Sequence, residues 1–259
     1  MIPKIIHYCW LSDNPVPKSM QRYISTWKRI MPNYEFIKWD FGRFDKNSSI
    51  WVKEAFDNKK YAFAADYIRL YALYNYGGIY LDMDVQVLKP FDDLLHLDYF
   101  VCYENHDNAK VPEVAAFGAT KNCWWFECLL KYYENRHFIL NENEFDMKPL
   151  PKVVRDVLKS NGISFCDIKT PNEAGNPNEV SVLPYDYFSP KSYFTGVLDI
   201  TSRTYSIHQF AGSWLTPRQR IEKSFFRFLG VRMTNALVSI KHLLKSKVSQ
   251  VMAHLHNLT

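Results

Sequence analysis

The chain has 259 residues, of which 47% are hydrophobic and 16% aromatic, and its formal net charge at pH 7 is +5. This size and composition predict one large hydrophobic core, and the absence of repeats or low-complexity tracts excludes a repeat architecture. The five cysteines are odd in number and form no Cys-x-x-Cys pair, so neither a disulfide framework nor a zinc site is indicated. A reducing cytoplasm fits this pattern best.

Short apolar segments alternate with helix-like segments along the chain, which is typical of an α/β protein. Strands are predicted over residues 2–10, 34–39, 99–104, 113–119 and 180–183, and helices over 18–31, 50–58, 61–76 and 124–135. The first segment contains a lysine and is typical of a buried strand rather than of a signal peptide. Residues 141–179 are polar and rich in Asn and Pro, so we expect a long connection or an inserted loop near a cleft.

The stretch from Gly77 to Val85 ends an apolar run with two carboxylates one residue apart, Asp82 and Asp84. Because side chains alternate along a strand, a strand here predicts that both carboxylates project from the same face. Two oxygen ligands at a strand end suit a divalent cation that also holds phosphates. The stretch therefore predicts a metal-diphosphate site, although an Asp-x-Asp pair alone also occurs in solvated turns.

Residues 61–76 are rich in Ala and Leu and predict a helix that stops at Gly77. Asp66 and Arg69 share one face of this helix. Since two glycines lead directly from the helix into the Asp-x-Asp segment, we expect both side chains to lie beside Asp82 and Asp84 in one cleft. The alternative is a surface ion pair between Asp66 and Arg69, of small energetic consequence.

Charge is concentrated at the carboxyl end. Residues 218–259 hold eight Lys or Arg and one acid, Glu222, so they carry +7 and residues 1–217 carry −2. Apolar side chains recur every three or four residues there, without the roughly 18 uninterrupted apolar residues that span a bilayer. The segment predicts a basic amphipathic helix that lies on an anionic membrane surface or, alternatively, packs on the rest of the chain or on a partner. Its apolar stripe disfavours nucleic acid as the partner.

Four motifs, in this order, resemble the Asp-x-Asp sugar glycosyltransferases of family 32. They are residues 2–10 (IPKIIHYCW), 65–69 (ADYIR), 77–84 (GGIYLDMD) and 208–214 (HQFAGSW). This family includes the yeast initiating mannosyltransferase, the glucosylating domains of large clostridial toxins, and bacterial capsular polysaccharide and O-antigen transferases. The resemblance covers about residues 1–217 and implies a GT-A type open twisted sheet flanked by helices, followed by the helical tail of residues 218–259.

The resemblance also implies a reaction. The expected function is a retaining hexosyltransferase that uses Mn²⁺ or Mg²⁺ and a nucleotide-sugar, with a UDP-hexose such as UDP-galactose or UDP-glucose favoured and a GDP-sugar left open. The acceptor is expected to be a lipid-linked saccharide in capsular polysaccharide or O-antigen biosynthesis. The chain would act in the cytoplasm, as a peripheral protein on the inner face of a bacterial plasma membrane.

Site residues follow from the same resemblance. The metal ligands are expected to be Asp82, Asp84 and His208, since an imidazole beside two carboxylates suits Mn²⁺ better than Mg²⁺. The catalytic set is Asp66, Arg69, Asp82 and Asp84, with Asp66 on the sugar hydroxyls and Arg69 assisting the donor. The donor-binding set adds the base-stacking aromatics Tyr8 and Trp10, together with Met83, Ser213 and Trp214. In the toxin branch one residue separates that Ser and Trp, whereas here they are adjacent. Apart from the resemblance, Glu104 and Asn105 are candidate acceptor-side groups because they follow a predicted strand.

Two other classes of function remain open from the sequence. A Mg²⁺-dependent phosphodiesterase or nucleotidyltransferase would use the same acidic pair, but the sequence offers no second cluster of carboxylates for a two-metal site. A non-catalytic membrane adaptor would use the basic tail and would leave the four ordered motifs unexplained.

Overall fold

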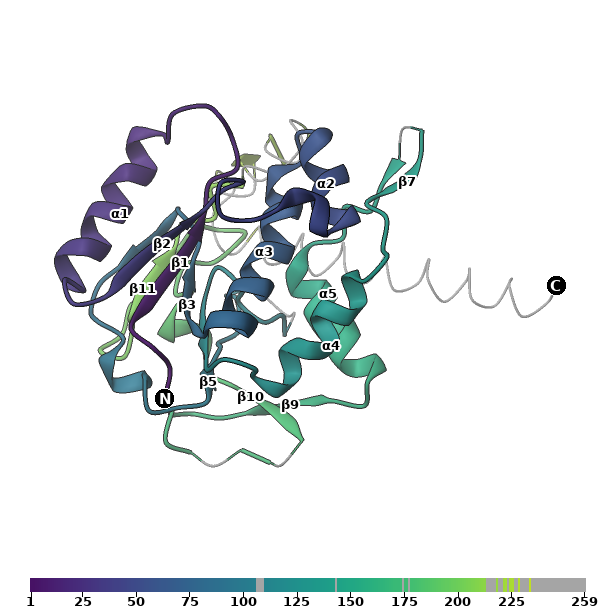
Figure 1. Ribbon diagram of the computed structural model, residues 1–259. Helices are drawn as coiled ribbons and strands as arrows, with labels where there is room; N and C mark the ends of the chain where they lie inside the picture. Colours follow the sequence, from purple (N-terminus) through teal and green to yellow (C-terminus); the bar gives the residue numbers. More distant parts are fainter. Residues whose placement is uncertain are drawn as a thin grey trace.

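The computed structural model describes residues 1–105, 110–142, 144–173, 175–176 and 178–212, and beyond these residues 218, 221–222, 224–225, 228 and 233. Its centre is a twisted five-stranded sheet in the order β2-β1-β3-β6-β5 (Figure 1). The first strand is parallel to β2 and β3, whereas β6 is antiparallel to β3 and β5, so the sheet is mixed. The bounds are β1 Ile5–Cys9, β2 Glu35–Trp39, β3 Gly78–Leu81, β5 Tyr99–Phe100 and β6 Ala116–Ala119.

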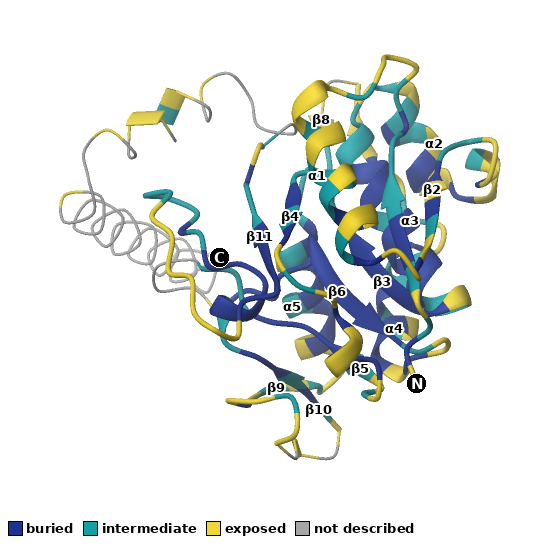
Figure 2. Cartoon of the chain, turned by 90° about the vertical axis from the view of Figure 1, so that its left-hand side faces the viewer, coloured by how far each residue is buried: buried dark blue, intermediate teal, exposed yellow. Residues whose placement is uncertain are grey.

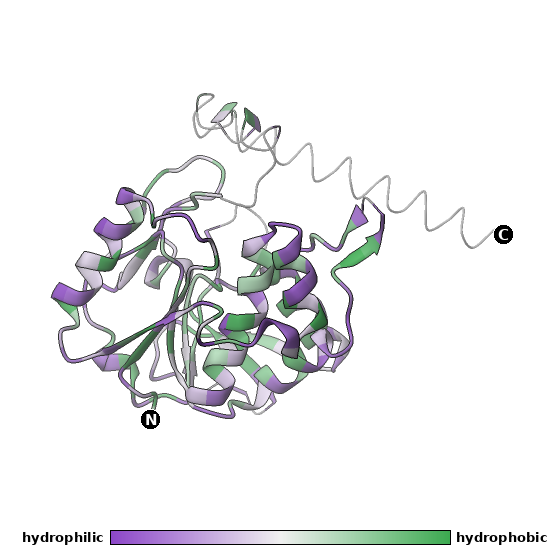
Figure 3. Cartoon of the chain, turned by 45° about the horizontal axis from the view of Figure 1, so that its top comes forward, coloured by the Kyte–Doolittle hydropathy of each residue, from purple (hydrophilic) through white to green (hydrophobic). Residues whose placement is uncertain are grey.

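Helices cover both faces of this sheet (Figure 1). Helix α1 (Lys18–Ile30) lies on one face, and α3 (Tyr61–Tyr76) lies on the other, with α2 (Ile50–Asp57), α4 (Trp124–Tyr133) and α5 (Leu150–Ser160) packed outside it. Because strand side chains alternate, Ile79 and Leu81 enter the apolar cluster beneath α1 while Tyr80 enters the cluster beneath α3. Figure 2 shows the strands as the buried centre, and Figure 3 shows hydrophilic residues on the outer helix surfaces.

Three two-stranded ladders and three short 3₁₀ turns complete the described part of the chain. Strand β4 (Val85–Val87) pairs antiparallel with β11 (Ser206–His208), which brings a late segment against the Asp-x-Asp region. Strands β9 (Ser164–Asp167) and β10 (Glu179–Val182) pair in parallel, and β7 (Ile139–Asn141) forms a hairpin with β8 (Glu144–Phe145). The 3₁₀ turns are η1 Lys46–Ser48, η2 Asp92–Leu94 and η3 Tyr185–Tyr187.

The connection between α3 and β3 requires glycine at two positions. Gly77 has φ of 67° and Gly78 has φ of 113°, in the region that other residues rarely adopt. A Cβ on Gly78 would lie 2.8 Å from the carbonyl oxygen of Ile5 and 3.0 Å from His7 Nε2. The glycine pair therefore lets β3 lie directly against β1, which fixes where the Asp-x-Asp segment begins.

His7 supports the same junction from β1. Its ring is fully buried, Nε2 lies 2.8 Å from the carbonyl oxygen of Gly77, and Nδ1 accepts a hydrogen bond from the Trp39 indole at 3.1 Å. This pattern defines a neutral imidazole that donates from Nε2. Burial lowers the pKa of His7 to about 4, in keeping with that neutral form.

The predicted fold class is confirmed, and the predicted helix over 61–76 coincides with α3. The prediction of a long loop over 141–179 is wrong, because this region contains α5 and β9. The apolar side chains of α5 form a buried stripe at helical spacing, between polar flanks that obscured it: Leu150, Val153, Val154, Val157 and Leu158. The strands predicted over 99–104 and 113–119 are shorter in the structure, as β5 ends at Phe100 and β6 begins at Ala116.

The predicted tail over 218–259 lies almost wholly outside the described residues, so its division from residues 1–217 stays a prediction. Several of its described side chains are exposed, with exposed fractions of 71% for Ile221, 87% for Phe228 and 55% for Met233. Within the described part of the chain, no helix has the length and apolar character that crossing a membrane requires.

Candidate active site

The predicted base-stacking aromatics lie at the same edge of the sheet as the carboxylates. Strands β1 and β3 are parallel, and their register pairs His7 with Tyr80. Tyr8 is therefore level with the end of β3, and Trp10 lies just beyond it. Both side chains are partly exposed: the Tyr8 ring packs edge-on against Trp27 at 5.7 Å, and Trp10 Nε1 donates to the carbonyl oxygen of Asn14. Ligands of open α/β sheets bind at this carboxyl edge.

A turn, rather than a strand, brings the two carboxylates of the Asp-x-Asp motif together. Asp82 follows the last residue of β3, and the Val85 N–H donates to the carbonyl oxygen of Asp82 at 2.9 Å. The expectation that strand alternation aligns Asp82 and Asp84 is therefore wrong in mechanism, although the carboxylates do converge. Asp84 is anchored through Oδ2, which accepts from the Ala211 N–H at 2.7 Å.

His208 completes this cluster from a distant part of the chain. It is the last residue of β11, and it pairs with Val85 next to Asp84. Ligand atoms of Asp82, Asp84 and His208 all lie within 4.8 Å of one another, and His208 Nε2 is 3.7 Å from Asp84 Oδ2. Two carboxylate oxygens and one imidazole nitrogen that converge in this way fit a divalent transition metal such as Mn²⁺.

Glu113 is a further member of this site that the sequence did not reveal. Its side chain is fully buried, its Oε2 lies 3.0 Å from His208 Nδ1, and its Oε1 accepts from the Ala115 N–H at 2.7 Å. A fully buried glutamate is rare unless it is paired. In the sequence Glu113 is one residue of a predicted strand, 95 positions away from its partner His208, and no motif marks the pair.

The charges around His208 set its protonation. Burial disfavours the charged imidazole, but the carboxylates of Glu113 and Asp84 outweigh burial and raise the pKa of His208 to about 10. The pKa of Glu113 is correspondingly held below its usual value by His208, against the effect of burial. A cation that binds at Nε2 replaces the proton there, because a metal ligand must be the neutral imidazole.

Arg69 organises the carboxylates from α3. Arg69 is 5% exposed, and its guanidinium lies 3.0 Å from Asp66 Oδ1, 3.2 Å from Asp82 Oδ2 and 2.8 Å from the carbonyl oxygen of Val114. It also lies over the Tyr80 ring, 4.6 Å from the centroid. The pair with Asp66 is therefore buried, and the alternative of a surface ion pair is wrong.

Asp66 is 8% exposed and lies against the same guanidinium. Burial raises the pKa of Asp66 to about 7; Arg69 opposes this rise and the nearby Asp82 adds to it. The pKa of Asp82 is also raised, first by burial and then by Asp84, with Arg69 acting in the opposite direction. A carboxylate that ionises less readily than usual is typical of a functional cleft.

The other predicted site residues differ in burial and in their hydrogen-bond partners. The Met83 side chain is buried at 6% exposed in the apolar cluster beneath α1. Asn105 Nδ2 donates to the carbonyl oxygen of Pro190, and the Glu104 N–H donates to that of Val111. Ser213 and Trp214 lie outside the described residues, so the prediction for them stays open.

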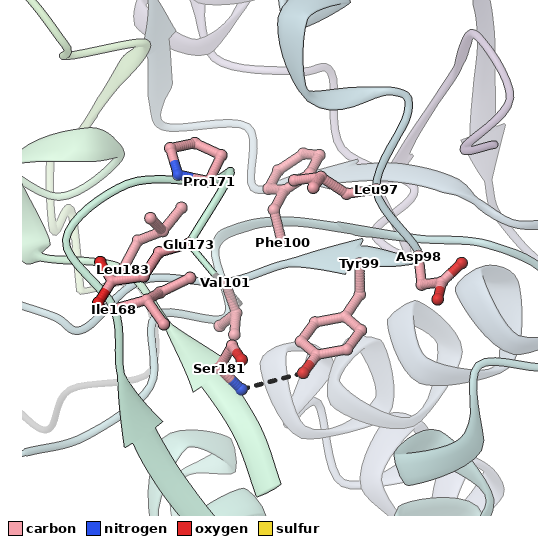
Figure 4. Close-up of a pocket in the computed structure, with 10 residues that line it drawn as sticks. All are labelled: Leu97, Asp98, Tyr99, Phe100, Val101, Ile168, Pro171, Glu173, Ser181 and Leu183. Carbon is pink, nitrogen blue, oxygen red and sulfur yellow. Dashed lines mark hydrogen bonds between the residues drawn. The ribbon is translucent and has the colours of Figure 1, made fainter. Parts of the chain in front are cut away.

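A pocket beside β5 lies apart from this cluster (Figure 4). Tyr99 lines it and accepts a hydrogen bond from the Ser181 N–H at 2.9 Å, as the dashed line in Figure 4 marks. Through β6, Tyr99 is in register with Gly78, at the start of β3, whereas Asp82 follows the end of that strand. We therefore assign this pocket no part in the acidic site.

Comparison with known proteins shows which proteins this chain resembles. Residues 17–101 match the family described as "Glycosyltransferase sugar-binding region containing DXD motif". Inositol phosphoceramide mannosyltransferase 2 of Schizosaccharomyces pombe is 35% identical over 75% of this chain and 56% of its own length. An uncharacterized glycosyltransferase of Acanthamoeba polyphaga mimivirus is 28% identical over 87% of this chain and 88% of its own. Among solved structures, the PaToxG glycosyltransferase has a TM-score of 0.47 and 17% identity, covering 62% of this chain and 69% of that one.

The match over residues 17–101 and the curated relatives show that this chain is similar to glycosyltransferases that carry a DXD motif. The chain is similar to the DXD glycosyltransferases of family 32, the family that its four sequence motifs resemble. It spans 60% and 56% of the length of two of its fission-yeast relatives, inositol phosphoceramide mannosyltransferases 1 and 2.

Proposed function

We propose that this glycosyltransferase moves a hexose from a nucleotide-sugar to a lipid-borne saccharide, with retention of configuration and with Asp82, Asp84 and His208 as ligands of a divalent cation. The observation that carries the proposal is the convergence of these three side chains at the carboxyl edge of the sheet, the edge at which β1 ends near Tyr8 and Trp10. Two carboxylates from residues 82–84 and an imidazole from β11 support a cation site that would hold a diphosphate.

The chain's own residues bind and orient the donor. Tyr8 and Trp10 offer aromatic faces for the nucleotide base. Asp66 accepts hydrogen bonds from sugar hydroxyls, and Arg69 holds Asp66 and Asp82 in place. Asp82, Asp84 and His208 would hold the cation, which when bound would supply a Lewis acid against the negative charge of the departing diphosphate.

Retention is proposed to proceed by front-face displacement, because no residue is assigned as a covalent nucleophile. The bond from the anomeric carbon to the phosphate oxygen breaks, and a bond from that carbon to the acceptor hydroxyl oxygen forms on the same face. The proton of the acceptor hydroxyl passes to the departing phosphate. Negative charge develops on the oxygens of the departing diphosphate, and a cation held by Asp82 and Asp84 would offset it.

The donor and acceptor follow from chemistry and from the relatives. Relatives named inositol phosphoceramide mannosyltransferases support a hexose as the sugar and a lipid-borne group as the acceptor. We place UDP-glucose and UDP-galactose first among donors, with GDP-mannose as the principal competitor. The pathway we propose is capsular polysaccharide or O-antigen synthesis.

The tail would hold the enzyme at the cytoplasmic face of the membrane where such acceptors lie. The exposed apolar side chains Ile221, Phe228 and Met233, together with the +7 charge of residues 218–259, support a peripheral contact with anionic lipid.

A donor and acceptor panel tests this proposal. The full chain is incubated with Mn²⁺, one of several UDP- or GDP-sugars and a lipid-linked saccharide, and the product is analysed by NMR at its new anomeric centre. Transfer of one hexose with the anomeric configuration of its donor is expected. Transfer with inverted configuration would overturn the retaining assignment. No transfer, together with no Mn²⁺-dependent nucleotide binding in calorimetry, would favour the adaptor.

A further inference from the structure

We propose that Glu113 is a positioning residue that fixes the ring orientation and tautomer of His208, so that Nε2 is presented to a cation beside Asp84. The inference rests on the proposed metal site and deepens it, because it adds a residue that binds no ligand itself. It concerns how tightly the site holds its cation.

The two nitrogens of His208 face different groups. Nδ1 lies 3.0 Å from Glu113 Oε2, and Nε2 lies 3.7 Å from Asp84 Oδ2. An ionised carboxylate can only accept a hydrogen bond, so Nδ1 must carry the hydrogen. The Nε2 lone pair of the neutral ring then points to the carboxylate cluster. A carboxylate that orients a metal-binding histidine through its other nitrogen also increases the basicity of that histidine.

Glu113 is itself held rigidly. It is fully buried, its N–H donates to the carbonyl oxygen of Cys102 at 2.7 Å, and its Oε1 accepts from the Ala115 N–H at 2.7 Å. With one carboxylate oxygen anchored to its own backbone segment, the other has a fixed position from which to meet Nδ1 of His208. The orientation of the imidazole is therefore determined before any ligand arrives.

The same short segment anchors the other groups of the site. The carbonyl oxygen of Val114 accepts from Arg69 at 2.8 Å, and that of Ala115 accepts from the Asp82 N–H at 2.7 Å. Three consecutive residues, 113–115, thus hold His208, Arg69 and Asp82 in one arrangement. Of these three links, those of Val114 and Ala115 are made by backbone carbonyl groups. The link from Glu113 to His208 is made by a side chain, so a substitution can remove it.

The test is the affinity for Mn²⁺, measured by electron paramagnetic resonance on the full chain, with Mn²⁺ alone and with Mn²⁺ plus UDP. In Glu113→Gln the amide can donate as well as accept, so the tautomer of His208 is no longer fixed and the negative charge is lost. We expect the affinity to fall 10–100-fold, as is typical when such a partner is removed.

A double-variant cycle isolates the proposed route. In a His208→Ala background, Glu113→Gln should change the Mn²⁺ affinity by less than about twofold, since the residue through which it acts is gone. Glu54→Gln is the matched control: Glu54 accepts from His137 Nδ1 at 2.7 Å and from the Phe138 and Ile139 N–H groups, in a pair that belongs to α2 and the β7 region. This variant should bind Mn²⁺ like the wild type.

The outcomes separate this inference from the proposed function. Wild-type Mn²⁺ affinity in a folded Glu113→Gln variant, or an equal loss in the His208→Ala background, would overturn the inference and leave the transferase intact. If Glu113→Gln does not fold, Glu113→Asp retains the charge but withdraws it by one methylene, and unchanged affinity there would also overturn it. A wild type that binds Mn²⁺ but turns over no donor would instead contradict the proposed function.

Discussion

Removing the guanidinium of Arg69 should destabilise the fold strongly, because it would leave the buried carboxylate of Asp66 and the partly buried carboxylate of Asp82 without their cationic partner. In Arg69→Met, Asp66 and Asp82 lose contacts of 3.0 and 3.2 Å, and the carbonyl oxygen of Val114 loses a donor at 2.8 Å. Breaking a buried pair from one side costs about 3–5 kcal/mol. For a chain of this size each kcal/mol lowers Tm by about 2–4 °C, so a fall of about 6–20 °C is expected.

Urea unfolding of the metal-free protein, followed by circular dichroism, measures this cost. Arg69→Lys should lie between the wild type and Arg69→Met, since one ammonium cannot reproduce the fork of the guanidinium. Asp66→Asn/Arg69→Met should be less destabilised than Arg69→Met, because it strands one carboxylate fewer. A loss below about 1 kcal/mol in Arg69→Met would refute the view that Arg69 holds this cluster together.

Three further predictions concern the β1–β3 junction and the tail. The pKa of His7 is about 4 in the fold against 6.5 for a free imidazole, so the unfolded chain takes up the proton first as the pH falls. The contribution of neutral His7 to the free energy of unfolding is therefore fully present above pH 6.5, and about 3 kcal/mol of it is lost as the pH drops to 4. His7→Gln, which does not titrate, should reduce this dependence in urea titrations, and an unchanged slope would contradict the assignment. Gly78→Ala should lose about 1–3 kcal/mol through backbone strain alone, with more from the contact to β1, by the same measurement; wild-type stability would show that the turn relaxes. The double variant Phe228→Ser/Met233→Ser should co-sediment less than the wild type with phosphatidylglycerol vesicles, and as much as the wild type with neutral vesicles. If the variant and the wild type bind phosphatidylglycerol vesicles equally, the tail makes no membrane contact through these side chains.

Local sequence was sufficient for the elements whose signals are local. Helix α3 has the predicted bounds, because its Ala and Leu content and the following Gly77 act within a few residues. Helix α5 was missed, because its apolar stripe is short and lies between Asn- and Pro-rich flanks. The Asp-x-Asp carboxylates were predicted to converge, but on a strand; the turn closed by the Val85 N–H depends on how β4 meets β11, which no local pattern encodes.

The candidate site was predictable only where motifs mark it. Asp82, Asp84 and His208 stand in recognisable motifs, and the structure brings them together. Glu113 stands in none, and its meaning arises from a contact with His208, 95 positions away. The place of Arg69 in the motif was evident, yet its burial between two carboxylates was not. Long-range pairing of charges in the core follows from tertiary packing, which spacing along the chain cannot show.

The central claim is that Asp84 and its neighbours hold a cation on which donor cleavage depends. Its most direct test is the release of nucleoside diphosphate from the preferred nucleotide-sugar by wild type and Asp84→Asn, with Mn²⁺ or with a chelator. We predict release that requires Mn²⁺ in the wild type and is lost in Asp84→Asn, while both proteins unfold at similar temperatures. Release at the wild-type rate by Asp84→Asn, or by the wild type in chelator, would contradict the account.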